Sequence, residues 1–164
     1  MMKVFYNKAY TAAAHVFDTT RKSGEIATAM DEGCAPGCEL VDPVDFVDLA
    51  KELIEATHAP AYVKALRTGE PHDLAESQGF SWDEGIWDMA VNSTAGVLAA
   101  ADEALATGGS SGSLSSGLHH ARHAGGAGYC TVNGLAMSAT RATKLVSGTV
   151  VILDLDAHCG GGTN

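Results

Sequence analysis

Residues 149–158 read Thr-Val-Val-Ile-Leu-Asp-Leu-Asp-Ala-His, an apolar run that ends in two carboxylates and an imidazole. A continuous run of β-branched and aliphatic side chains is typical of a strand that is covered on both faces in a parallel sheet. We therefore expect a buried strand over residues 149–155. Because side chains alternate along a strand, Asp154, Asp156 and His158 would lie on one side, at its carboxyl end.

The residues before this run predict a layered α/β fold. Residues 3–6 are expected to form a second strand, and residues 33–38 a turn-rich loop. Ser81 and Glu84 fit a capping box that would start the longest helix, and the Gly/Ser stretch 108–117 is expected to be a flexible connection. The spacing of apolar residues predicts helices over 18–30, 48–57, 61–67, 81–107 and 132–146. Strands that alternate with helices indicate helices packed on a sheet.

The composition excludes several classes of protein. The chain has 164 residues, 46% of them hydrophobic and 18% charged, which is enough to build a packed core. Its net charge of −10 and the absence of a basic patch argue against nucleic-acid binding, whereas a cationic substrate is compatible. No apolar run reaches the ~20 residues that span a bilayer, so no membrane is expected. The first residues lack a secretory signal and the four cysteines are sparse, so we expect a cytoplasmic protein.

The carboxylates and imidazole at the end of the apolar run predict a metal site. Two carboxylates buried side by side are unfavourable unless a cation or hydrogen-bond donors compensate them. Open α/β proteins bind ligands at this edge of the sheet. Asp and His side chains together suit Zn²⁺ or another first-row divalent ion. The alternative is that an aspartate merely caps the following loop. The presence of His158 beside the two carboxylates makes this alternative less favoured.

A second cluster lies in residues 118–123, which read Leu-His-His-Ala-Arg-His. On a loop, the adjacent side chains of His119 and His120 can aim at one small site, which is harder on a helix. Two imidazoles beside one metal-bound water can act as base and acid. A pair of histidines alone is weak evidence, because such pairs are common on surfaces. His123 is expected to be exposed.

Three motifs in register resemble the histone deacetylase superfamily. They are the His-His loop at 118–122, the Gly-Tyr-Cys-Thr-Val-Asn segment at 128–133 and the Asp-x-Asp-x-His end at 151–158. Residues 84–88 and the His-x-x-x-Tyr segment at 58–63 resemble earlier parts of the family. The resemblance implies a three-layer αβα fold of the arginase/deacetylase type with a mostly parallel sheet. Residues 1–164 would then be the N-terminal part of one such domain, truncated after the strand that carries Asp154 to His158.

The resemblance also implies a reaction, the zinc-dependent hydrolysis of N-acetylated amines such as acetyl-lysine or an acetylpolyamine. Asp156 and His158 would be two of three protein ligands of zinc, or of another divalent metal. His119 and His120 would flank the zinc-bound water, one as general base, and Asp154 would orient His119 by a hydrogen bond.

Two further features of the site follow from the same resemblance. Gly128 and Tyr129 would line the narrow slot for the acyl-lysine chain, with the tyrosine ring against its methylenes. In family members that have a potassium ion, K⁺ would lie near Asp154 and Asp156. An acetylated small molecule or protein is therefore the expected partner, and homo-oligomerisation stays open.

The chain departs from the family pattern at Cys159, where relatives usually have a second histidine, and at Gly161, where they have Asp or Asn. The third zinc ligand and a catalytic tyrosine lie further downstream in the family, so we expect residues 1–164 alone to be inactive. Two alternatives remain. A degenerate, non-catalytic member would act as a binding module, and a ureohydrolase-like manganese enzyme would share the Asp-Ala-His of residues 156–158.

Overall fold

Three parallel strands form the sheet in this computed structural model, which describes residues 1–13, 18–116 and 118–164. Strand β1 (Met2–Phe5) lies between β2 (Cys38–Val41) and β3 (Gly112–Ser113). Met2 pairs with Cys38 on one side, and Val4 pairs with Gly112 on the other. The expected α/β class with a parallel sheet is confirmed, and so is the strand expected over residues 3–6, which forms one residue earlier as β1.

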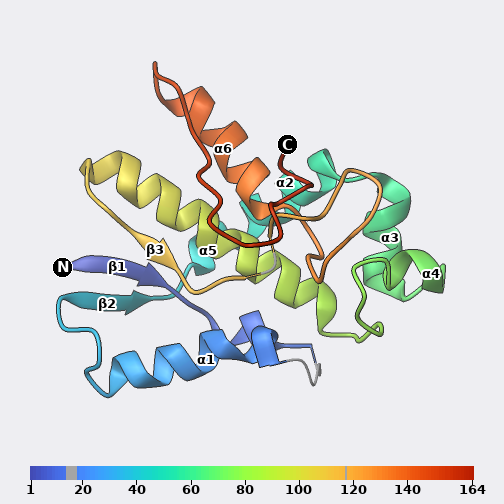
Figure 1. Cartoon of the computed structure of the whole chain (residues 1–164), viewed down its shortest axis with the longest axis horizontal. Helices are drawn as coiled ribbons and strands as arrows, with labels where there is room; N and C mark the ends of the chain where they lie inside the picture. The colour runs from blue at the N-terminus through green and yellow to red at the C-terminus, as the bar shows by residue number, and fades with distance from the viewer. Residues whose placement is uncertain (14–17, 117) are drawn as a thin grey trace.

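Helices lie on both sides of these strands (Figure 1). The five expected helices are confirmed with shifted ends, as α1 (Asp18–Asp31), α2 (Val47–Thr57), α3 (Pro60–Thr68), α5 (Ile86–Thr107) and α6 (Gly134–Leu145). The short helix α4 (His72–Ala75) and the 3-10 helices η1 (Lys8–Thr11) and η2 (Val44–Phe46) were not expected. Helix α1 contacts β2, whereas α5 contacts β1 and β3 and also packs against α2 and α6.

The main core forms around α5. Ile86 and Leu98 of this helix are fully buried, and they belong to one cluster with Ile54 of α2, Leu66 of α3 and Met137 of α6. Among the described residues, no helix is both long and apolar enough to cross a membrane. Helix α5 contacts α6 as well as β1 and β3, so it links this core to the sheet.

The start of α5 differs from the sequence prediction. The helix begins at Ile86, and the capping box of Ser81 and Glu84 does not form. The Trp82 side chain is drawn toward α3, where its Nε1 donates to the Leu66 carbonyl at 2.9 Å. At Gly85 the backbone is so close to η1 that a Cβ would lie 2.4 Å from the Ala12 carbonyl oxygen. These contacts hold the preceding residues away from a helical start.

The Gly/Ser stretch after α5 contains a strand that was not expected. Residues 112–113 form β3, and the Leu114 amide donates to the Phe5 carbonyl at 3.0 Å. The Ser111 hydroxyl donates to the Lys3 carbonyl at 3.1 Å. Serine side chains and backbone, not apolar packing, therefore hold this segment to β1. The last residue of the stretch, Gly117, lies outside the described residues.

The expected buried strand over residues 149–155 is wrong. The segment has no regular structure, and Val151, Leu153 and Leu155 are 76%, 78% and 86% exposed. A strand that is covered on both faces needs neighbouring strands for its backbone hydrogen bonds. In the described part of the chain, the sheet ends at the short strand β3, and residues 149–155 pair with no strand. The site residues that follow are therefore presented by an irregular segment.

Candidate metal and catalytic site

The loop after β3 brings His119 and His120 side by side. Their ring centroids are 4.1 Å apart, and both residues line a cavity of about 530 Å³. Each predicted site residue except Asp154 lines this same cavity, namely His119, His120, Gly128, Tyr129, Asp156 and His158. The fold thus gathers residues that are widely separated in the sequence.

Asp154 lies beside His119 and hydrogen-bonds to it. The distance from His119 Nδ1 to Asp154 Oδ2 is 2.8 Å, and the two side chains keep only 16% and 24% of their surface exposed. This hydrogen bond, followed by one from the Asp156 amide, lowers the pKa of Asp154. A carboxylate at Nδ1 fixes the ring orientation and leaves Nε2 for a second partner. The contact expected between these two residues is present, and its catalytic role stays a prediction.

Local turns, and not the pleat of a strand, present Asp156 and His158. The Asp156 amide donates to Asp154 Oδ1 at 2.9 Å, and the His158 amide donates to Asp156 Oδ1 at 2.8 Å. His158 Nδ1 lies 3.0 Å from the same Asp156 oxygen. The backbone hydrogen bond and then the imidazole lower the pKa of Asp156. Both carboxylates of this segment are therefore ionised near neutral pH.

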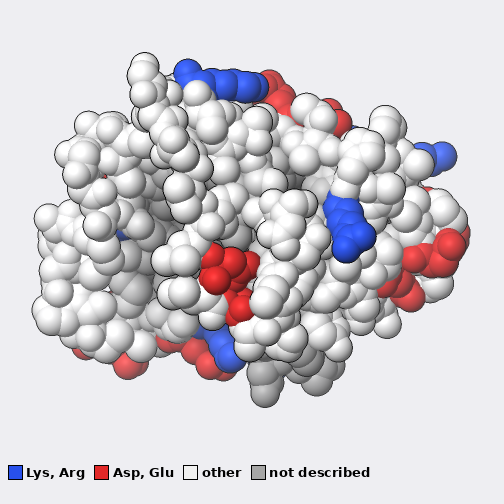
Figure 2. Space-filling view, turned by 45° about the horizontal axis from the view of Figure 1, so that its top comes forward, with Lys and Arg blue, Asp and Glu red and all other residues white. Residues whose placement is uncertain are grey.

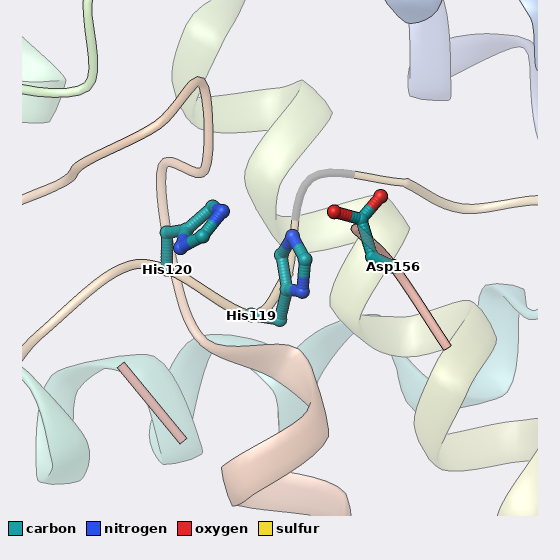
Figure 3. A group of neighbouring side chains, drawn as sticks. All are labelled: His119, His120 and Asp156. Atoms are coloured by element: carbon teal, nitrogen blue, oxygen red, sulfur yellow. The ribbon is translucent and has the colours of Figure 1, made fainter. Parts of the chain in front are cut away.

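His119, His120 and Asp156 form a donor set that suits a divalent metal (Figure 3). One ligand atom from each residue lies within 4.8 Å of the others. Imidazole and carboxylate donors suit Zn²⁺ and other first-row ions. The His158 ring lies 6.4 Å from that of His120, and its side chain is 80% exposed. The residues present thus fit a metal, while the expected ligand pair of Asp156 and His158 stays a prediction.

Charge on the surface is unevenly distributed. Figure 2 shows a small group of acidic side chains in a hollow near the centre of one face, with a basic side chain just below it and another to its right. Asp154 and Asp156, whose pKa values are lowered, add negative charge at the site. Negative charge in a recess attracts cations to it.

The segment of Gly128 and Tyr129 forms another wall of the cavity. Both residues have a left-handed backbone, with φ of 50° and 62°. A Cβ at Gly128 would lie 2.6 Å from the His120 ring, so only glycine allows this close approach. The Tyr129 ring is 48% exposed and its centroid lies 5.2 Å from that of Phe80. Burial raises the pKa of the neighbouring Cys130 thiol, which keeps it protonated.

Several residues around the cavity were not predicted as functional. Phe80 supports the Tyr129 ring, and the Gln78 carbonyl accepts a hydrogen bond from the Tyr129 amide at 2.8 Å. His58 and Asn133 are buried behind the His-His loop. His58 and Asn133 stood in segments that resemble the family, but nothing in their spacing indicated a contact. His123 is exposed as expected, although its Nδ1 contacts the Thr57 carbonyl at 2.6 Å.

The parallel strands and the cavity lined by imidazoles and a carboxylate define a class, that of α/β proteins with a site suited to a divalent metal. Within that class, a family model described as the histone deacetylase domain matches residues 15–164, and the chain belongs to this family.

Two curated relatives are similar to parts of the chain. An uncharacterized protein of Picosynechococcus sp. is 33% identical over 113 residues, which are 67% of this chain and 37% of that protein. The acetoin utilization protein AcuC of Staphylococcus aureus is 42% identical over 50 residues, which are 30% of this chain and 13% of that protein. The chain thus spans well under half the length of the curated relatives that it matches.

Proposed function

We propose that this chain carries part of the active site of a zinc-dependent deacetylase that hydrolyses N-acetylated amines, such as acetyl-lysine or an acetylpolyamine. The observation that carries the proposal is the His119–Asp154 hydrogen bond beside a cavity that His120 and Asp156 also line. Membership of the histone deacetylase family supports the same reaction. A cytoplasmic location belongs to the proposal on the sequence grounds given above.

In this proposal Asp156 and His158 hold the metal. Asp156 is ionised, and its contact with His158 brings an imidazole to the same place. A zinc ion supplies a Lewis acid that polarises the amide carbonyl when it is bound. Another divalent ion would suit the same donors. A potassium ion near Asp154 and Asp156 is likewise part of the proposal, supported by their negative charge.

His119 and His120 would move the proton. Asp154 accepts the Nδ1 proton of His119, so Nε2 is left to accept a proton from the attacking water. The His120 ring lies close enough to stabilise charge at the same point. The pair would then return the proton to the leaving amine, as a general acid does.

The acyl chain of the substrate would lie against Tyr129. Its exposed ring at the cavity wall offers an apolar face to methylene groups, and Gly128 beside it lets the His120 ring approach closely. Negative charge at the site would favour an amine that is cationic elsewhere along its chain. An acetylated polyamine satisfies this condition through its remaining amines, and an acetyl-lysine peptide does so when basic residues flank the acetylated lysine.

Two measurements on residues 1–164 test the proposal. The first is turnover of a fluorogenic acetyl-lysine amide with and without zinc, which we expect to be absent because the family's third zinc ligand and tyrosine have no counterpart in these residues. The second is binding of an aliphatic hydroxamate, a chelating analogue of the substrate, to the zinc-loaded chain.

We expect the hydroxamate to bind only with zinc, and more weakly to Tyr129→Ala. Tyr6→Ala serves as the control, because Tyr6 lies outside the cavity lining. Robust turnover by residues 1–164 would contradict the expected inactivity. Hydroxamate binding that changes neither on removal of zinc nor in Tyr129→Ala would contradict the proposed location of the site. Binding of an acetylated peptide without any metal would instead favour a non-catalytic binding module.

A further inference from the structure

A buried histidine outside the cavity joins two segments that carry site residues. His58 follows α2, is only 2% exposed, and has hydrogen-bond partners at both ring nitrogens. Its Nδ1 lies 3.0 Å from the Arg122 carbonyl oxygen, and its Nε2 lies 3.3 Å from the Asn133 amide nitrogen. A carbonyl only accepts and an amide only donates, so the proton is on Nδ1 and Nε2 is the acceptor.

The same junction holds the residues just after the His119–His120 pair by their backbone carbonyls. Ala121 O accepts from the Asn133 side chain at 3.1 Å, and Arg122 O accepts from His58. His123 O accepts from the Ala59 amide at 2.8 Å. Three consecutive carbonyls are thus fixed, which leaves the backbone next to the pair little freedom.

Asn133 carries this arrangement into helix α6. Its side-chain oxygen accepts from the Ala136 amide at 3.0 Å and so caps the helix, while its own amide donates to His58. Tyr62, one turn further along on α3, donates to the Thr131 carbonyl at 2.6 Å. Both segments that flank the cavity are therefore tied to the α2–α3 junction.

We propose that His58 is a positioning residue for the His119–His120 pair: neutral and protonated at Nδ1, it links the backbone after the pair to the start of α6. A histidine with only a structural role would contribute to the stability of the fold as a whole. The contacts of His58 instead end on the backbone next to the pair and on the residue that caps α6. This inference rests on the proposed function only in one respect, that the function makes the His119–His120 pair important. Both tests use the metal-free chain.

The first test is nitrogen NMR of the histidine rings in the metal-free chain. We expect His58 to show a protonated Nδ1 and an unprotonated Nε2 near neutral pH, and we expect the Asn133 amide proton to be protected from exchange. His58 with the proton on Nε2, or a rapidly exchanging Asn133 amide, would overturn the proposal. This test needs no variant, so it is decisive even if substitutions unfold the chain.

The second test follows the His119 ring in three variants. His58→Leu removes both contacts, His58→Asn can keep a donor near Arg122 O, and His58→Gln can keep an acceptor near the Asn133 amide. We expect His58→Leu to lose the NMR signature of the His119 Nδ1 hydrogen bond to Asp154, and one of the polar variants to restore it in part. His72→Gln is the matched control, because this histidine is exposed and far along the chain from the loop.

Circular dichroism establishes that each variant is folded. A folded His58→Leu chain that keeps the His119 signature unchanged would show that His58 stabilises the fold without positioning the pair. Because neither test uses zinc or a substrate, failure here is distinct from failure of the proposed deacetylase activity.

Discussion

Gly160 and Gly162 allow the last residues of the chain to lie directly against the His-His loop. A Cβ at Gly160 would be 2.3 Å from Asp154 Oδ2, and one at Gly162 would be 2.2 Å from the Ala121 carbonyl oxygen. The Gly162 amide also donates to the His119 carbonyl at 3.0 Å. At these two glycines the C-terminal segment thus approaches its neighbours too closely for a side chain.

Gly162→Ala should therefore push the C-terminal segment away from the loop. We expect loss of the His119–Asp154 hydrogen bond, seen by NMR, and a destabilisation of roughly 1–3 kcal/mol, which is usual for overpacking. Gly161→Ala is the control, since its Cβ would meet only the Cys159 carbonyl oxygen at 3.8 Å. Equal behaviour of the two variants would contradict the close docking.

His58 should also make stability depend on pH. Burial lowers its pKa in the folded chain, and Tyr62 and His123 are the titratable groups that face it. The unfolded chain then binds the proton more readily, so stability present above about pH 6.5 is lost as the pH falls through the folded pKa. We expect denaturant titrations to show this loss in the wild type and a smaller one in His58→Gln. An identical slope in both proteins would refute the assignment to His58.

At the scale of elements, α5 approaches η1 and β3 through a glycine. A Cβ at Gly96 would lie 1.7 Å from the Tyr10 hydroxyl oxygen and 2.5 Å from Ser113 Oγ. Tyr10 is 3% exposed and its hydroxyl lies 3.2 Å from Ser113 Oγ, so the ring has little freedom to move. The helix therefore sets the distance between the core and the edge strand.

Gly96→Ala should separate these elements, although alanine favours helix. We expect a loss of roughly 1–3 kcal/mol in the free energy of unfolding from overpacking, measured by chemical denaturation. Gly109→Ala should stay within about 0.5 kcal/mol, because its Cβ would meet only Thr107 Oγ1 at 3.4 Å. A neutral or stabilised Gly96→Ala would show that α5 lies further from η1.

The sequence predicts the helices better than the strands. Apolar spacing indicated α2, α3, α5 and α6, because helix patterns repeat over many residues within one segment. Strand β3 consists of Gly112 and Ser113, which carry no strand signal, and it forms only because β1 offers backbone partners. Conversely, residues 149–155 have a strong strand pattern and no such partner among the described residues. Pairing is a tertiary property that a local pattern does not contain.

At the scale of the whole molecule, the exposed apolar run is the feature that least resembles an ordinary surface. Leu153 and Leu155 are 78% and 86% exposed, next to Val151 at 76%. Contiguous apolar surface of this kind promotes association. Because the run forms no strand here, it contributes little to the core.

Leu153→Lys combined with Leu155→Lys should therefore reduce association and leave stability nearly unchanged. We expect less light scattering on concentration and a change within about 0.5 kcal/mol for each exposed substitution. The matched control is Leu98→Lys, which places a charge at a fully buried position and should prevent folding. A strongly destabilised double variant would mean that the run is buried, as its sequence pattern predicts.

The sequence predicts which residues line the cavity, although their roles there stay predictions. The residues of the His-His loop and of 154–158 could be named because chemistry restricts which side chains suit a metal. Their mutual arrangement could not be derived, since it depends on turns at Asp156 and on the close approach at Gly160. The contacts of His58 were not predicted, because they are to backbone atoms, which leave no pattern in the sequence.

The most direct test of the central claim is a calorimetric titration of the chain with Zn²⁺. We expect one saturable site, weakened roughly tenfold or more in Asp156→Asn. The control variant is Asp48→Asn, because Asp48 is an exposed carboxylate on α2 that pairs with Lys51. The affinity of this variant for Zn²⁺ should be unchanged. Absence of saturable zinc binding, or equal binding by wild type and Asp156→Asn, would contradict the claim that this cavity is the metal site of a deacetylase.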